Sequence, residues 1–350
     1  MARHEVGSGT MLIAHCADQH FGSGKGLFSM GGEFSYLDRT VSACDRLVES
    51  FRSKGVDGVI SAGDLWHTKN PTPEEIGAVI RFLLELDTLG VPCIIIPGNH
   101  DQQNPTTTVL DHLRPLQGKL SNVILVNDPK VYDLWGLKVA VVPGHRNECV
   151  SDLVGEDPDI LVIHADVKGG AYDNGVKSYR GLDLSPYSSI PYIALGDFHS
   201  RQRINNAAYP GSAYQTKFGE KSLKRGYLLV KWTKSGPKAK PVNIPQDYPL
   251  ITIEVETQDQ LNSRLAEIPP SYTVKVKVKQ GVTIDLGEDK RVTKVETTAV
   301  KTDIEIQSAT VEDPLSGIED ILKQGGYDLS EEKTQVVKDE ARKIVTAVDG

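Results

Sequence analysis

The stretch MLIAHCADQH at residues 11–20 decides the fold, because an apolar run is followed at once by Asp18 and His20. The same arrangement recurs in GVISAGDLWH at residues 58–67 and in CIIIPGNHD at residues 93–101. Each apolar run has the length and composition of a buried strand. Polar residues that directly follow such strands indicate loops gathered at one edge of a sheet.

Two amphipathic segments, at residues 36–54 and 73–89, separate these three strands and are predicted to be helices. The alternation of strand and helix is typical of an α/β fold with a parallel sheet. Further strands are predicted at residues 123–126, 137–142, 160–164, 192–195 and 226–231.

Two of the later strands also end in polar residues. His164 closes one of them, and Asp197 and His199 follow another. In α/β sheets, ligands collect outside the carboxyl ends of the strands, so the five polar clusters are expected to converge on one crevice. Glycines within the clusters let the chain turn sharply there.

The residue types in the clusters indicate a metal centre. Carboxylates, imidazoles and an amide suit manganese, magnesium, zinc or iron better than thiolate-bound metals. A carboxylate between two ions about 3.5–4 Å apart can bridge them, and such a pair promotes displacement at phosphorus. Each cluster alone has an ordinary explanation, because Asp and Asn also fill turns and cap helices. Five clusters in this order favour phosphoester hydrolysis.

The ordered motifs resemble those of the calcineurin-like metallophosphoesterases. More narrowly, AHCADQHFG, SAGDLWH, IPGNHD, IALGDFHS and above all YPGSAYQTKFGE at residues 209–220 resemble bacterial or phage DNA nuclease subunits of the SbcD and Mre type. The resemblance covers residues 11–231. It implies a four-layer sandwich of two mainly β sheets flanked by helices, with a small α/β capping domain and a helical C-terminal tail.

The resemblance also implies two divalent ions, expected to be manganese with magnesium as the alternative. Their ligands would be Asp18, His20, Asp64, Asn99, His164 and His199. Asp64 would bridge the two ions. Asp197 departs from the family pattern, which has a histidine there, but a carboxylate can ligate a hard ion and is expected to complete the set.

Three further residues are implied to take part in catalysis. His100 would be the general acid that protonates the departing sugar oxygen, and Asp101 would orient or polarise its ring. His67 would contact the scissile phosphate or assist the leaving group, although it could instead pack beside Trp66. By contrast, His15 lies within the first strand and is expected to be buried and hydrogen-bonded.

Basic residues are concentrated after the last metal motif. They can contact DNA phosphates, which dominate nucleic-acid affinity, or form an ordinary solvated face. The sequence leaves both interpretations open for Arg201, Arg203, Lys217, Lys221, Lys224 and Arg225.

Three domains are predicted. Residues 1–245 form the metallophosphoesterase domain, residues 246–285 a small capping domain, and residues 286–350 a linker and a helical tail. The tail has narrow apolar stripes, and the resemblance implies that it binds a coiled-coil ATPase like SbcC. The alternative is a tail folded back on its own core. A homodimer is also expected.

Composition excludes few functions. The formal net charge is −8, but residues 282–350 carry 16 acidic and 9 basic side chains, so the remainder is nearly neutral. Bound divalent ions would make its active face positive, and acidity therefore does not exclude DNA. No apolar run approaches the roughly twenty residues that span a bilayer, and the N-terminus lacks a secretory pattern. Without a cysteine framework, a cytoplasmic protein is expected.

The expected function is that of a metal-dependent DNA exonuclease and endonuclease. It would act in DNA repair or recombination as the nuclease component of an SbcCD-like complex. The alternative within the same chemistry is a phosphoprotein phosphatase or a cyclic-nucleotide phosphodiesterase. A non-catalytic scaffold is a third interpretation, but it would predict broken motifs, and only Asp197 departs from the pattern.

Overall fold

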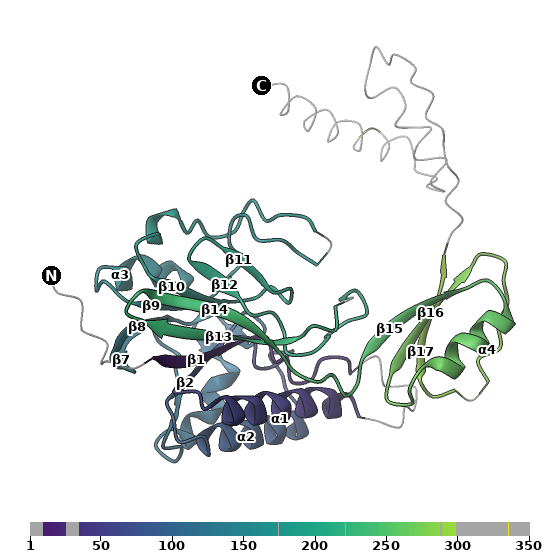
Figure 1. Cartoon of the computed structure of the whole chain (residues 1–350), viewed down its shortest axis with the longest axis horizontal. Coiled ribbons are helices and arrows are strands. Elements are labelled where there is room, and N and C mark those ends of the chain that lie inside the picture. The colour runs from purple at the N-terminus through teal and green to yellow at the C-terminus, as the bar shows by residue number, and fades with distance from the viewer. Residues whose placement is uncertain are drawn as a thin grey trace, which may run out of the picture. The chain divides into compact units, whose positions relative to one another are not determined.

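Two six-stranded sheets form the body of the protein (Figure 1). The computed structural model describes residues 10–25, 35–173, 175–220, 222–287 and 289–298, and residue 335. The first sheet has the order β14 (Gly236–Asn243), β13 (Gly226–Thr233), β1 (Met11–Cys16), β2 (Gly58–Ala62), β3 (Cys93–Ile96) and β6 (Val123–Leu125). The second has the order β11 (Gln202–Ile204), β12 (Ala207–Tyr209), β10 (Tyr192–Gly196), β9 (Ile160–His164), β8 (Leu137–Val142) and β7 (Lys130–Leu134).

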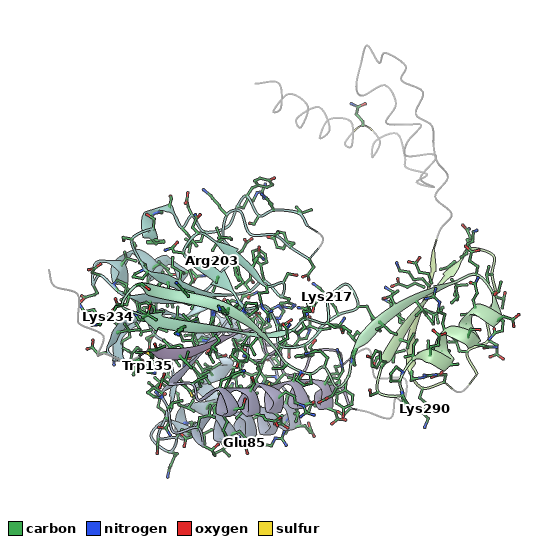
Figure 2. The ribbon with its side chains drawn as sticks, viewed as in Figure 1. Glu85, Trp135, Arg203, Lys217, Lys234 and Lys290 are labelled. Atoms are coloured by element: carbon green, nitrogen blue, oxygen red, sulfur yellow. The ribbon has the colours of Figure 1, made fainter. Side chains whose placement is uncertain are left out.

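The helices cover the outer faces of the sheets and complete four layers. α1 (Tyr36–Lys54) and α2 (Pro73–Asp87) pack on the first sheet, and α3 (Val150–Val154) packs on the second. Apolar residues from both sheets, including Ile60, Ile94 and Val162, fill the space between them. Figure 2 adds the side chains to the ribbon. The predicted two-sheet α/β sandwich is therefore confirmed.

The two long helices begin where the sequence supplies capping residues. The side chain of Ser35 caps α1, and Thr72 caps α2 with Glu75 completing the capping box. Such caps bind backbone N–H groups that have no partner within the helix. Gly55 ends α1 at a φ of 58°, a conformation that glycine adopts without strain.

The central strand β1 shows why the metal-binding loops lie together. β1 pairs in parallel with β2, and β2 with β3, while β9 and β10 are parallel in the second sheet. All five strands therefore point their carboxyl ends the same way within each sheet, and the polar clusters follow those ends.

A small α/β unit follows the second sheet in sequence. β15 (Leu250–Val255), α4 (Gln258–Glu267) and β16 (Thr273–Lys279) form a βαβ unit, and β17 (Val292–Thr298) pairs in parallel with β16. Its core includes Leu261 and Val276. β17 lies in the segment that was predicted to be linker, so this unit extends past the predicted boundary at residue 285. The predicted helical tail lies outside the described residues.

The lysines of β16 pair with acidic residues of the neighbouring strands and their ends. Lys275 contacts Glu296 at 2.6 Å, and Lys277 contacts Glu254 at 3.3 Å. These ion pairs explain the lysines at alternate positions of β16. No nucleic-acid ligand is needed to explain them.

Short elements complete the described chain. They are β4 (Gln102–Asn104), β5 (Thr107–Thr108), η1 (Val109–Leu116), η2 (Gly144–Cys149) and η3 (Ser185–Tyr187). All four cysteines are free thiols, which confirms that no disulfide framework exists. Among the described residues, no helix combines the length and apolar character needed to cross a membrane.

His15 is a buried structural residue, as its position in β1 predicts. Its Nδ1 lies 2.8 Å from the hydroxyl of Tyr192, and its Nε2 lies 3.1 Å from the carbonyl oxygen of Leu195. Burial lowers the pKa of His15 to about 3. Its ring thus joins the two sheets in the neutral form.

This burial predicts an acid sensitivity of the fold. Between pH 6.5 and about 3, the unfolded chain holds a proton on His15 that the folded chain lacks, so stability falls as pH falls. The loss approaches about 1.4 kcal/mol per pH unit. Urea denaturation of the wild type and of His15→Gln between pH 7 and pH 4.5 should show the shallower pH dependence in the variant. Equal slopes would contradict the assignment.

Candidate metal centre

The seven predicted ligands come together in one cluster, in which Asp18, His20, Asp64 and His164 are buried. A first group of donor atoms, from Asp18, His20 and His199, lies within 4.8 Å of one another. The Nε2 atoms of His20 and His199 face each other at 2.8 Å. One of the two nitrogens can donate a hydrogen bond to the other, and the same spacing would let both face a shared cation.

A second group of donors lies beside the first and shares the carboxylates. Asp18, Asp64 and His164 again have donor atoms within 4.8 Å. Nε2 of His164 also lies 2.9 Å from Oδ1 of Asn99. The side-chain oxygen of Asn99 therefore lies beside this group.

The carboxylate of Asp64 lies between the two groups. Its Oδ2 is 3.6 Å from Nε2 of His20, and its Oδ1 is 3.4 Å from Nε2 of His164. The two oxygens thus face different histidines. This is the geometry expected of a bridging carboxylate.

The backbone at these residues is held in a conformation that most side chains avoid. Asp18, His20, Asp64 and Asp197 have φ values of 57°, 47°, 54° and 114°. The loops after β1 and β2 lie side by side through hydrogen bonds such as Asp18 N–H to Gly63 O at 2.9 Å. Backbone strain of this kind persists only where surrounding contacts impose it, and it gathers at functional sites.

Glycine is required at two places beside the ligands. Gly63 has a φ of +98°, and a Cβ there would collide with the ring of His164. A Cβ on Gly98 would collide with the carboxylate of Asp64. The glycines of the Gly-Asp and Gly-Asn motifs thus allow the two loops to approach the donors closely.

Burial and the mutual contacts of the carboxylates and histidines shift the pKa values of the centre. Burial raises the pKa of Asp18 to about 7. Burial acts the same way on Asp64, but His164 and His20 reverse the effect and hold its pKa below the usual range. Burial lowers the pKa of His164, but the negative charge of Asp64 outweighs this effect and raises the pKa to about 10.

Divalent cations fit this donor set. Buried carboxylates are costly unless a counter-charge accompanies them. The donors are oxygen and imidazole nitrogen, which hard and borderline divalent metals prefer. The residues of the two groups are thus suited to hold such ions.

Asp197 lies at the edge of the cluster. Its Oδ1 is 3.7 Å from Nε2 of His164, and its backbone N–H donates to Oδ1 of Asp18 at 3.1 Å. Burial raises the pKa of Asp197. Its side chain is a quarter exposed, unlike those of Asp18 and Asp64.

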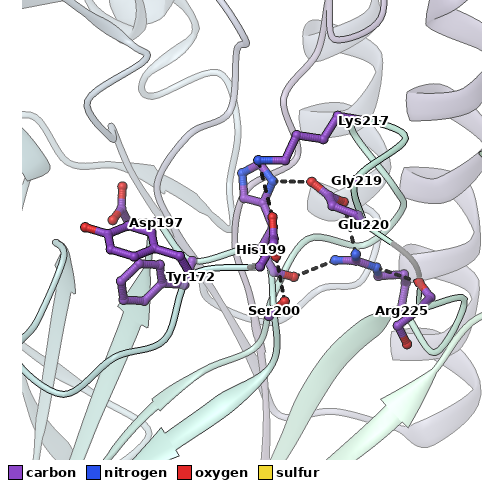
Figure 3. Close-up of a pocket in the computed structure, with 11 residues that line it drawn as sticks. Tyr172, Asp197, His199, Ser200, Lys217, Gly219, Glu220 and Arg225 are labelled. Atoms are coloured by element: carbon purple, nitrogen blue, oxygen red, sulfur yellow. Dashed lines mark hydrogen bonds and ion pairs between the residues drawn. The ribbon is translucent and has the colours of Figure 1, made fainter. Parts of the chain in front are cut away.

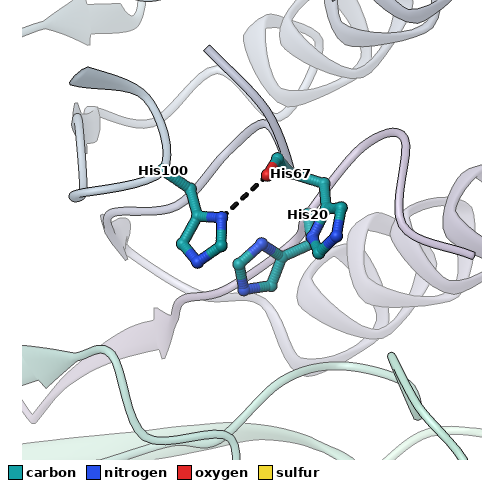
Figure 4. Close-up of side chains that lie close together, drawn as sticks. All are labelled: His20, His67 and His100. Carbon is teal, nitrogen blue, oxygen red and sulfur yellow. Dashed lines mark hydrogen bonds between the residues drawn. The ribbon is translucent and has the colours of Figure 1, made fainter. Parts of the chain in front are cut away.

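His67 and His100 form the exposed side of the centre (Figure 4). Their rings stack with centroids 5.4 Å apart, and the His100 ring lies 4.9 Å from that of His20. Nδ1 of His100 donates to the carbonyl oxygen of His67 at 2.7 Å. This bond leaves Nε2 of His100 available for proton transfer. Trp66 is fully buried, whereas His67 is partly exposed.

The hydrogen bonds of Asp101 go to backbone N–H groups rather than to the His100 ring with which it was expected to pair. The buried Asp101 carboxylate accepts hydrogen bonds from the backbone N–H groups of Gly98, Leu65 and Trp66, at 2.8, 3.1 and 2.7 Å. The side chain of Asp101 lies between the two loops and accepts hydrogen bonds from these N–H groups. Without Asp101, these buried N–H groups would lose their partner. Asp101 joins the Asp64 loop to the Asn99 loop, and the carbonyl of His67 orients the His100 ring.

The segment at residues 209–220 holds three different ligand loops. The hydroxyl of Tyr209 donates to the carbonyl of Ala165, directly after His164, at 2.7 Å. The hydroxyl of Tyr214 donates to the carbonyl of His20 at 3.0 Å. Glu220 accepts from Nδ1 of His199 at 2.7 Å. This segment thus positions the centre from outside.

Glu220 is the functional residue that sequence reasoning missed. Its side chain is fully buried and contacts Thr216 at 2.6 Å. It also contacts Arg225 at 3.0 Å (Figure 3). Burial favours its protonation, but His199 and Arg225 lower its pKa below the usual value. The sequence signal that could have found Glu220 is its position in the segment at residues 209–220, three residues after Lys217. From the sequence, Glu220 was given no role.

The basic residues predicted near DNA divide into two kinds. Arg225 is 5% exposed and is bound to Glu220 and to the carbonyl of His199, so it serves the fold. Arg201 likewise binds the backbone of Pro210 and Val242. Lys217 and Lys224 are exposed. Lys221 lies outside the described residues.

A four-layer α/β sandwich with a buried centre of carboxylates and imidazoles defines a metal-dependent phosphoesterase class. The chain belongs to the calcineurin-like phosphoesterase family, whose model matches residues 11–201. Members of this family use divalent metals, which agrees with the donor groups described above.

Three relatives show similarity at modest identity. The chain is 25% identical over 264 residues to the DNA double-strand break repair protein Mre11 of Saccharolobus solfataricus, covering 71% of this chain and 64% of that protein. It is 26% identical over 238 residues to the uncharacterized protein R555 of Acanthamoeba polyphaga mimivirus, covering 60% of this chain and 17% of that protein. It is 24% identical over 254 residues to the SbcD component of the nuclease SbcCD of Staphylococcus epidermidis, covering 63% of this chain and 66% of that protein. The matches thus span less than two thirds of each relative.

Replacing Asp101 should destabilise the protein by separating the two loops. At pH 8, Asp101→Asn should lower the free energy of unfolding by about 2–3 kcal/mol, because three buried N–H groups lose a charged acceptor. Urea denaturation measures the change. Asp152→Asn, an exposed aspartate of α3, is the matched control and should have no effect. Equal midpoints for the two variants would contradict this role.

Replacing Glu220 should weaken metal binding at the His199 group. Glu220→Gln keeps the shape of the side chain but removes the charge that orients and polarises His199, and loss of such a partner typically costs about 10- to 100-fold in metal affinity. Isothermal titration with manganese measures the dissociation constant. Glu49→Gln, whose side chain is 68% exposed on α1, is the control. An unchanged dissociation constant in Glu220→Gln would rule out the positioning role.

Proposed function

We propose that the chain is a metal-dependent DNA nuclease, with both exonuclease and endonuclease action, that hydrolyses phosphodiester bonds in DNA repair or recombination. The observation that carries the proposal is the placement of Asp64 between two donor groups, 3.6 Å from His20 and 3.4 Å from His164. This arrangement supports a centre for two ions.

The ligands of the two ions are proposed as follows. Asp18, His20 and His199 hold the first ion, Asp64 bridges, and Asn99, His164 and Asp197 hold the second. When bound, the two ions stabilise charge on the phosphoryl oxygens and acidify a water. Manganese is proposed as the physiological metal, with magnesium as the alternative, because two or three carboxylates and an amide favour hard ions.

His100 is proposed to protonate the leaving sugar oxygen. Its Nδ1 is committed to the carbonyl of His67, and its exposed ring lies beside His20. Nε2 of His100 is therefore the nitrogen proposed to transfer the proton. His67 is proposed to contact the scissile phosphate, since its ring stacks on His100 and is partly exposed.

DNA is the proposed substrate for two reasons. Two relatives of the chain are, by name, a double-strand break repair protein and a component of a nuclease. The segment at residues 209–220, which resembles those nucleases, also braces three ligand loops. A phosphoprotein phosphatase or cyclic-nucleotide phosphodiesterase has no comparable support.

The proposal extends to partners and domains. One relative is named as a component of the SbcCD nuclease, and we propose that residues 286–350 include a segment that binds an SbcC-like coiled-coil ATPase. Residues 1–245 form the nuclease domain, and the small unit that begins near residue 246 is the capping domain. A homodimer is proposed as the working assembly.

The nuclease assignment is tested with end-labelled duplex and single-stranded DNA in the presence of manganese. The wild type should degrade DNA, and His100→Ala should lower kcat by about 100- to 10,000-fold, the usual contribution of a general acid. Manganese affinity should remain, because His100 is not a proposed ligand. His112→Ala, which removes an exposed histidine of η1, is the control.

Two results would count against this function. Hydrolysis of phosphopeptides or cyclic nucleotides without any hydrolysis of DNA would favour the alternative phosphoesterases. Full DNA hydrolysis by His100→Ala would remove the proposed acid.

A further inference from the structure

We propose that the cavity beside His199 is a subsite for an unpaired nucleotide, in which Tyr172 stacks on the base and Lys217 contacts a phosphate. This inference rests on the proposed nuclease function and names the form of DNA that the centre accepts.

The cavity opens directly onto the metal-binding residues (Figure 3). Its volume is about 920 Å³, and its walls include Asp197 and His199 together with Tyr172 and Lys217. Sites for small ligands usually measure about 300–1,000 Å³. A nucleotide bound here would be adjacent to a phosphate at the metal centre.

Tyr172 is held firmly at one wall. Its hydroxyl donates to Oδ2 of Asp166 at 2.6 Å, and its ring meets that of Phe198 edge-on, with centroids 4.9 Å apart and planes at 90°. The residue nevertheless remains 44% exposed. Single exposed aromatic residues are common, but this one is fixed at both its hydroxyl and its edge. A pre-ordered ring loses little conformational entropy when a ligand stacks on it.

The loop that carries Tyr172 is anchored to the strand end that carries His199. The side-chain amide of Gln202 accepts from the N–H of Ala171 at 2.7 Å and donates to its carbonyl at 2.9 Å. The hydroxyl of Ser200 donates to Asp173 at 2.6 Å. These bonds keep the aromatic wall at a constant position relative to the metal-binding residues.

Lys217 supplies a cation at the same cavity. Its Nζ lies 3.3 Å from Oδ2 of Asp173, and its side chain is 62% exposed. An ammonium group has three N–H donors, so the contact with Asp173 positions Lys217 and leaves other donors for a ligand. Arg225, in contrast, is committed to Glu220. Lys217 is therefore suited to meet a phosphate of the bound strand.

The pairing of an aromatic face with a cation selects a single strand. Inside a duplex, both faces of each base pair are already stacked, whereas an unpaired base can stack on a protein aromatic. A small phosphomonoester without a base could meet Lys217 but would have nothing to stack on Tyr172. The substrate class is thus DNA with a single-stranded or frayed end.

The test compares two substrates in the full-length protein loaded with manganese. One is a single-stranded oligonucleotide, and the other is bis(p-nitrophenyl) phosphate, a diester without a base. Tyr172→Leu should lower the ratio of kcat/KM for the oligonucleotide to that for the small diester about 10-fold, because stacking contributes about 1–3 kcal/mol per base. Tyr172→Trp should preserve the ratio.

Lys217→Met and Tyr179→Leu complete the design. Lys217→Met should lower the same ratio and reduce the slope of log affinity against log salt by about 0.7, the value for one phosphate contact on a single strand. Tyr179 is 80% exposed on the same loop and does not line the cavity, so Tyr179→Leu should leave the ratio unchanged. Thermal denaturation of each variant checks that the fold is retained.

The outcomes separate the subsite from the nuclease function. If the wild type cleaves the oligonucleotide and Tyr172→Leu keeps the wild-type ratio, the subsite is wrong and the nuclease function stands. If the wild type cleaves only the small diester, both fail. If Tyr172→Leu and Lys217→Met instead impair hydrolysis of phosphopeptides, the cavity binds peptides and the proposal is overturned.

Discussion

The buried carboxylate of Asp64 is the constraint on which the rest of the structure depends. It lies 3.6 Å from His20 and 3.4 Å from His164, and its Oδ1 accepts the backbone N–H of His100. These partners lie at the carboxyl ends of three different strands, β1, β9 and β3. A charge with so little exposure to water requires compensation from all of them, because burial without partners is costly. The loops therefore must meet at one point.

The positions of those loops are maintained by groups outside the metal centre. Asp101 fills the space between two loops with three hydrogen bonds to backbone N–H groups. On the other side, Tyr209, Tyr214 and Glu220 each bind a different ligand loop. A site with strained φ angles needs such support, since nothing within the loops themselves favours those angles. The segment at residues 209–220 is thus explained by support of the centre.

The charges around the centre serve two purposes that the sequence does not distinguish. Arg225 is buried against Glu220 and stabilises the orientation of His199, whereas Lys217 is exposed at the neighbouring cavity. Both are basic residues within a few positions of each other. Burial separates a structural cation from one that can meet a ligand, because only the exposed one keeps unused donors.

The sequence by itself determined the α/β class, the strand ends and the polar residues that follow them, because apolar periodicity and residue type are local properties. It also placed His15 in the core. Only the tertiary structure decided the partners of Asp101, the role of Glu220, the strand β17 and the cavity wall at Tyr172. These depend on contacts between residues far apart in the chain, such as Glu220 with His199 and Tyr214 with His20. Local pattern carries no information about which distant backbone group a buried side chain will meet.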